Sequence, residues 1–89
     1  MSQPSKYIYD YLGGKSVKAN TIFTSTDITT QFPTAKIVEM RTDNVKVSIN
    51  GTDATTWMRG DAAYVDAGRT WVFLNDCEIA IATLVDLAV

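Results

Sequence analysis

From residue 35 onward, polar and apolar side chains alternate with a period of two. Residues 45–49 place three apolar side chains on one side and two polar ones on the other, the pattern of a half-buried strand. Residues 77–89 carry the longest alternation in the chain. A helix over residues 80–87 is the alternative, but a period of two fits the whole segment better. The pattern therefore predicts strands here.

Further short strands are predicted where β-branched and aromatic residues gather between turn residues. These segments are residues 20–24, 35–41, 54–58, 62–65 and 69–74. In the last of them Trp71 and Phe73 share one face, because they are two residues apart. Six or seven short strands at this spacing are typical of a β-sandwich or a β-barrel.

Two dipeptides predict tight turns between strands. Asn50-Gly51 is a strong hairpin signal, because both residues tolerate a positive φ. Asn75-Asp76 predicts a second hairpin, with a weaker signal because glycine is missing. Residues 25–34 are polar and Thr-rich and include Pro33, so we expect a loop with Ile28 and Phe32 turned inward.

The composition agrees with the strand pattern. Val, Ile and Thr together supply 27 of the 89 residues, whereas Leu occurs four times and Glu twice. Residues branched at Cβ favour strands, and the usual material of solvent-facing helices is scarce. We therefore predict an all-β protein, a small antiparallel β-sandwich or barrel. Residues 19–89 form its single domain.

Residues 1–18 differ from the rest and are predicted to form an extended N-terminal arm. Tyr7, Tyr9 and Tyr11 alternate with other residues, which suits an extended segment with the tyrosines on one side. A short helix over residues 5–12 is the alternative, since Gly13-Gly14 would end it after two turns. An extended arm of this length would reach a neighbouring molecule. We expect deletion of residues 1–14 to leave the body folded and to abolish assembly.

Net charge and the lack of targeting signals limit the classes of partner and compartment that we expect. The formal net charge is −2 and the isoelectric point about 4.8, and no run of basic residues supplies a nucleic-acid footprint. No stretch of about 18 apolar residues predicts a membrane helix. No apolar signal segment follows Met1, and Cys77 has no second cysteine to pair with. We expect synthesis in a reducing cytosol.

The chemistry of the side chains argues against an enzyme. The chain contains no histidine, the commonest general base and a frequent metal ligand. Cys77 heads the apolar side of its strand, so packing is a better interpretation than nucleophilic catalysis. We predict no cofactor and no metal site.

Acidic residues gather at the predicted turns. Asp53, Asp61, Asp66 and Asp76 would form a Ca²⁺ site if the turns converged, but Asp is also an ordinary turn residue, and we favour that interpretation. The tripeptide 59–61 spells Arg-Gly-Asp and resembles integrin-binding loops. The competing interpretation, which we prefer, is a turn made by glycine and capped by the aspartate.

Aromatic residues supply the candidate binding surface. Trp57, Tyr64 and Trp71 would suit a sugar-stacking platform, although such residues in a small β-domain more often lie in a core or an interface. We place an assembly interface first. Its predicted residues are Tyr7, Tyr9, Tyr11, Trp57, Tyr64 and Trp71.

Residues 45–81 resemble small virion proteins of tailed bacteriophages, of the capsid decoration or cement type. The residues that carry the likeness are 45–51, Gly60, 66–68, 71–74 and 77–81. The resemblance implies a β-rich subunit, often oligomeric, that is fastened to a capsid lattice and stabilises it. We therefore predict a structural virion protein whose partners are copies of itself and a major capsid protein. The alternative is a cell-surface or carbohydrate-binding β-module of the phage tail or adhesin type.

Overall fold

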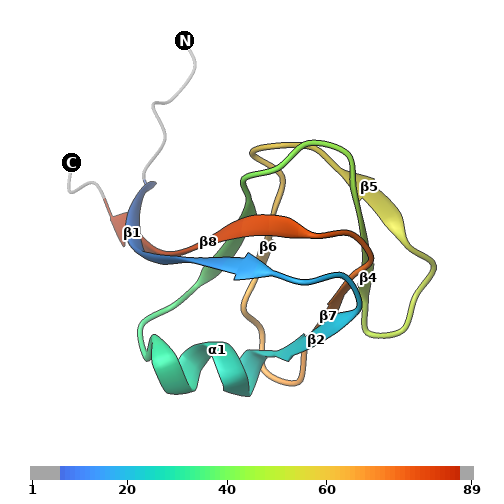
Figure 1. The fold of residues 1–89 in the computed structure, drawn as a ribbon. Coiled ribbons are helices and arrows are strands. Elements are labelled where there is room, and N and C mark those ends of the chain that lie inside the picture. Colours follow the sequence, from blue (N-terminus) through green and yellow to red (C-terminus); the bar gives the residue numbers. More distant parts are fainter. Residues whose placement is uncertain (1–6, 87–89) are drawn as a thin grey trace, which may run out of the picture.

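A computed structural model describes residues 7–86 of the chain and builds them into two antiparallel four-stranded sheets (Figure 1). One sheet has the strand order β1-β8-β3-β6 and the other the order β2-β7-β4-β5. The prediction of a small all-β sandwich is confirmed. The elements are β1 (Tyr7–Val17), β2 (Thr21–Thr24), α1 (Ser25–Gln31), β3 (Ile37–Met40), β4 (Val45–Ile49), β5 (Thr55–Trp57), β6 (Ala62–Tyr64), β7 (Thr70–Phe73) and β8 (Cys77–Asp86).

The core lies between the two sheets and is built from alternate residues of each strand. Trp71 and Phe73 of β7 are completely buried, as the shared face of residues 69–74 predicted. The Phe73 ring meets Trp57 and Phe23 edge-on, with centroid distances of 6.5 and 6.1 Å. The facing sheet contributes Val38, Met40, Cys77, Ile79 and Ile81.

Most connections pass from one sheet to the other, and the β4–β5 connection is the one that stays within a sheet in residues 7–86. Asn50 and Gly51 form its turn with φ of 53° and 74°, and the Thr52 amide donates to the Ile49 carbonyl at 3.0 Å. The hairpin predicted there is confirmed. The hairpin predicted at Asn75-Asp76 is wrong, because β7 and β8 belong to different sheets.

The loop predicted for residues 25–34 contains the helix α1, which corrects that prediction. Thr24 caps the helix: its hydroxyl accepts from the Asp27 amide at 3.1 Å, and the Asp27 carboxylate accepts from the Thr24 amide at 3.0 Å. This reciprocal capping box starts a helix even in a Thr-rich sequence. Ile28 is buried and Phe32 half-buried, so their predicted inward orientation is confirmed.

Residues 7–17 of the predicted arm form β1, a long strand of the chain's own sandwich. β1 pairs with β8 from Tyr7 opposite Asp86 to Val17 opposite Cys77, and an extra residue at Leu12 makes a bulge. The extended conformation expected for this segment is confirmed, but the strand does not leave the body. Residues 1–6 and 87–89 lie outside the described part of the chain.

Candidate binding face on one sheet

The β1-β8-β3-β6 sheet has an outer face, turned away from the second sheet. The strand registers place Tyr11, Ala82, Ile37 and Tyr64 in one row across it. Ile37 and Ala82 are buried, yet they do not belong to the core between the sheets. Since neighbouring strands are about 4.8 Å apart, the two tyrosines lie about 14 Å from each other along this row. The row therefore has an apolar centre between two aromatic ends.

Exposed tyrosines lie on both edge strands of this face, β1 and β6. Tyr9, Tyr11 and Tyr64 are 39%, 53% and 57% exposed. The Tyr9 and Tyr11 rings meet edge-on with their centroids 6.1 Å apart. The next row of the sheet consists of Gly14, Ala80, Glu39 and Ala62, so Glu39 is flanked by small residues.

A buried carboxylate holds one of these tyrosines in place. Glu39 is 5% exposed, and both of its oxygens lie 3.1 Å from the Tyr11 hydroxyl, which donates to them. The Arg41 guanidinium donates to the same carboxylate at 2.7 Å, and its Cζ lies 5.9 Å from the centroid of the Tyr11 ring. Paired in this way, the charge of Glu39 is compatible with its burial.

The same contacts shift two pKa values. Burial raises the pKa of Tyr11, and the hydrogen bond to Glu39 raises it further. The hydrogen bond to Glu39 also raises the pKa of Arg41. Tyr11 therefore stays protonated and Arg41 charged in neutral solution. The cluster thus links β1 to β3 through charged and hydrogen-bonded side chains.

A shallow groove of about 390 Å³ runs beside this cluster. Gly14 and Ala80 contribute to its floor, while Tyr11, Arg41 and Glu78 line its sides. The groove is open to solvent and its wall carries both charges. Such a surface suits a protein partner with polar groups at the rim better than a small enclosed ligand.

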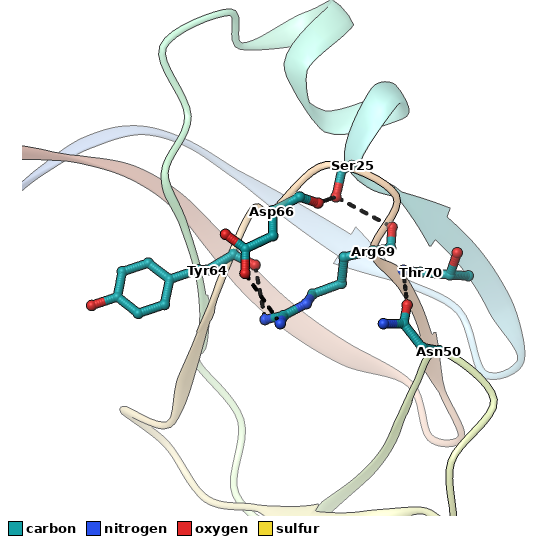
Figure 2. Close-up of polar contacts among 6 residues, drawn as sticks. All are labelled: Ser25, Asn50, Tyr64, Asp66, Arg69 and Thr70. Atoms are coloured by element: carbon teal, nitrogen blue, oxygen red, sulfur yellow. Dashed lines mark hydrogen bonds and ion pairs between the residues drawn. The ribbon is translucent and has the colours of Figure 1, made fainter.

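A polar network holds the backbone at Tyr64 and the loop that follows it (Figure 2). The Arg69 guanidinium donates to the Tyr64 carbonyl at 3.2 Å and pairs with the Asp66 carboxylate at 3.2 Å. The Ser25 hydroxyl donates to the carbonyl of Asp66 and lies 3.2 Å from that of Arg69. Figure 2 shows the Tyr64 ring pointing away from this network. Ser25 of helix α1 thus holds the loop that follows Tyr64.

The same loop is also fastened to the β4–β5 hairpin. The Asn50 side-chain oxygen accepts from the Thr70 amide at 2.8 Å, and the Asn50 amide donates to the Thr70 carbonyl at 2.8 Å. Asn50 therefore serves both the hairpin turn and the start of β7, and Figure 2 shows it at the base of the network.

The structure corrects part of the predicted interface. Tyr9, Tyr11 and Tyr64 share the outer face, whereas Trp57 and Trp71 are 8% and 0% exposed and belong to the core. The two tryptophans are therefore unavailable as interface residues, and the proposed sugar platform of Trp57, Tyr64 and Trp71 is not formed. Tyr7 belongs to β1 by its backbone, and its side chain lies outside what the structure describes.

Sequence reasoning missed Glu39 and Arg41. A signal was present, because Glu39 interrupts the apolar run of residues 37–40, and a charge in a strand buried on both faces needs a partner. The partner could not be named, since Tyr11 is 28 residues away in the chain. The small residues at positions 80 and 82 were also not recognised as the floor of a binding face.

Two of the four turn aspartates, Asp61 and Asp76, accept hydrogen bonds from backbone amides. The Asp61 carboxylate accepts from the Met58 amide at 2.8 Å, and the Gly60 φ is 94°, so the Arg-Gly-Asp tripeptide is a capped turn as expected. The Asp76 carboxylate accepts from the Ala19 amide at 2.8 Å. Within residues 7–86, no group of three or more acidic or cysteine side chains is arranged to hold a metal ion.

Cys77 is a packing residue of β8. It is 6% exposed, and burial raises the pKa of its thiol, with further contributions from Glu78 and Asp76. A thiol kept protonated in this way is a poor nucleophile. This agrees with the packing role predicted for it.

Comparisons with known proteins add no further information. No protein-family model, curated protein or solved structure matches the chain. No helix within residues 7–86 is long and apolar enough to cross a membrane.

Proposed function

We propose that the chain is a structural virion protein of the decoration type, which binds an assembled capsid shell through the outer face of the β1-β8-β3-β6 sheet. The observation that carries this proposal is the arrangement of Tyr9, Tyr11 and Tyr64, all well exposed, at the two edges of one sheet face. The two strands between them present Ala80, Ala82, Ile37 and Glu39 on this face. Tyrosine buries a large area at low cost in side-chain entropy, which makes it a common anchor in interfaces. The virion assignment itself comes from the family resemblance.

Pre-organisation favours such a role. Tyr11 is held by Glu39 at 3.1 Å, and the backbone at Tyr64 is held by Arg69 at 3.2 Å. Anchors that are already ordered lose less entropy on binding. A subunit that binds the assembled shell and not its separated parts stabilises the shell by mass action.

Co-sedimentation with capsid shells of the phage that encodes the chain tests the proposal. We expect saturable binding to intact shells and little binding to dissociated capsid subunits. Tyr64→Ser and Tyr9→Ser should each weaken binding by about tenfold, the loss typical of an interface anchor.

Ile22→Ser is the matched control, because Ile22 is 61% exposed and lies on β2 in the other sheet. It should leave binding unchanged. Absence of wild-type binding would rule out the decoration role. Equal losses of affinity in all three variants would show that the outer face is not the binding site.

A further inference from the structure

β1 is an edge strand of unusual length. It has eleven residues and ends its sheet, with β8 on one side. Among residues 7–86, the backbone of β1 makes its strand ladder with β8 and with no other strand. Long edges of this kind pair readily with another strand, and proteins usually shorten, charge or cover them.

The bulge at Leu12 divides the side chains of β1 in a specific way. Tyr11 lies opposite Ala82 and Gly13 opposite Ile81, so the usual alternation slips by one residue. Tyr9, Tyr11, Gly14 and Ser16 therefore share the outer side. The inner side carries Asp10, Leu12, Gly13, Lys15 and Val17.

This slip selects one register for antiparallel pairing of β1 with itself. An ordinary strand matches its own faces only when opposed residue numbers have an even sum, because side chains alternate with period two. Across the bulge, every side chain from residue 9 to residue 16 finds a partner on its own side when Leu12 opposes Gly13 of a second copy. Two-fold symmetry then repeats each contact.

The same register is complementary in charge and shape. It sets Asp10 opposite Lys15 of the second copy, and these are the acidic and the basic residue of β1. It also sets Tyr11 opposite Gly14 of the second copy, and an aromatic ring packs well over a cross-strand glycine. By symmetry each pair occurs twice, and each contributes to strand association.

We propose that two copies of the chain pair antiparallel along β1 in this register and form one continuous eight-stranded sheet. A bulge and a lysine usually hinder pairing at a strand edge. In this dimer the bulges of the two copies lie opposite each other, and Lys15 lies opposite Asp10 of the second copy. The two outer faces then join, with Tyr9 and Tyr11 of both copies at the centre. The inference concerns the strand edge and does not depend on what the outer face binds.

Charge reversal with rescue tests the register. Sedimentation velocity over a concentration series should show a monomer–dimer equilibrium for the full chain. Asp10→Lys places a lysine opposite Lys15 of the second copy, and symmetry repeats this repulsive contact. The substitution should therefore raise the dimer Kd by about tenfold or more. Lys15→Asp should do the same, although it also removes the Lys15 contacts with Gln31 and Phe23. The double variant Asp10→Lys with Lys15→Asp should recover the wild-type Kd to within about threefold.

Asp53→Lys is the matched control, because it makes the same change of charge at an exposed position before β5. It should leave the dimer unchanged. Circular dichroism on every variant separates a loss of pairing from a loss of fold. A chain that stays monomeric, a dimer that Asp10→Lys does not weaken, or a double variant that is not rescued overturns the proposal.

Cross-linking gives an independent readout. Tyr9 opposes Ser16 of the second copy, so Tyr9→Cys with Ser16→Cys should form a disulfide-linked dimer under mild oxidation. The two positions lie about 23 Å apart within one extended strand, too far for an internal bond. Tyr9→Cys with Lys18→Cys is out of register and should cross-link much more slowly. Equal rates for the two variants would contradict the register.

Discussion

The Tyr11 hydroxyl on β1 donates to the Glu39 carboxylate on β3, 3.1 Å from each oxygen, across the intervening strand β8. The Tyr11 side chain can extend across β8 because the β8 residues on this face, Ala80 and Ala82, have small side chains. The bond joins the two ends of a three-strand span and leaves the Tyr11 ring exposed. One contact therefore serves both stability and the candidate binding face.

Removing this hydroxyl should weaken the fold in a way that depends on pH. Tyr11→Phe should lower the free energy of unfolding by about 1 kcal/mol near neutral pH, the usual contribution of one hydrogen bond. Because the folded-state pKa of Tyr11 is raised, first by burial and then by the Glu39 hydrogen bond, the folded chain holds this proton more tightly. The contribution is complete below the unfolded-state pKa of about 10 and declines as the pH rises through the folded-state value.

Urea unfolding at about pH 8 and about pH 10.5 measures the effect. The difference between wild type and Tyr11→Phe should shrink at the higher pH. Tyr9→Phe is the control, since Tyr9 touches the Tyr11 ring and not the carboxylate. A difference that grows with pH would show that the assigned proton linkage has the wrong sign.

The two glycines of β1 should respond very differently to a methyl group. A Cβ on Gly13 would lie 2.8 Å from the Phe32 ring, whereas a Cβ on Gly14 would lie 3.4 Å from the Ile79 carbonyl. Gly13→Ala should cost about 1–2 kcal/mol through overpacking, because the half-buried ring must move. Gly14→Ala should be nearly neutral, since alanine also restricts the unfolded chain. Thermal and urea unfolding of the pair decides the point, and equal costs would mean that Phe32 yields freely.

The contrast between the turns explains how far the sequence could predict the fold. Asn50-Gly51 encodes its turn locally, through two residues that accept a positive φ, so that hairpin was predictable. Asn75-Asp76 also turns the chain, but which sheet the next strand joins depends on packing between distant segments. Period-two alternation specifies a strand and its buried side, not its neighbours.

The candidate site was predictable to the same partial extent. The tyrosines were visible in the sequence, but their gathering on one face depends on β6 and β1 lying at opposite edges of one sheet. The tryptophans were equally prominent and are core residues, because aromatic side chains serve both purposes in small β-domains. Helix α1 was missed although Thr24 and Asp27 carry a capping signal, because β-branched residues outweighed it.

The Thr24 cap should contribute measurably to the free energy of unfolding. Thr24→Ala removes the acceptor of the Asp27 amide and should cost about 1 kcal/mol, as is usual for an N-cap. Thr24→Ser should restore most of the loss. Thr26→Ala changes an exposed residue of the same helix and should cost little. Chemical unfolding of the three variants tests this, and a Thr24→Ala variant as stable as Thr26→Ala would show that the cap contributes nothing.

Deletion of residues 1–14 should unfold the body, contrary to the expectation from the sequence alone. The deletion removes most of β1, so that β8 loses its pairing with β1 from Ala80 to Asp86. It also removes the Leu12 contact with the core and leaves the Glu39 carboxylate without Tyr11. Because a domain of this size is stable by only about 5–13 kcal/mol, the combined loss should abolish cooperative folding.

A truncation of residues 1–6 is the matched control, since it leaves all of β1 in place. Thermal melts followed by circular dichroism, with light scattering to detect aggregation, compare the two proteins. The shorter deletion should melt cooperatively near the wild-type temperature, and the longer one should show no transition or should aggregate. A cooperative melt for the longer deletion would mean that β1 is dispensable, and the edge strand could then act as the detachable arm that its tyrosine pattern suggested.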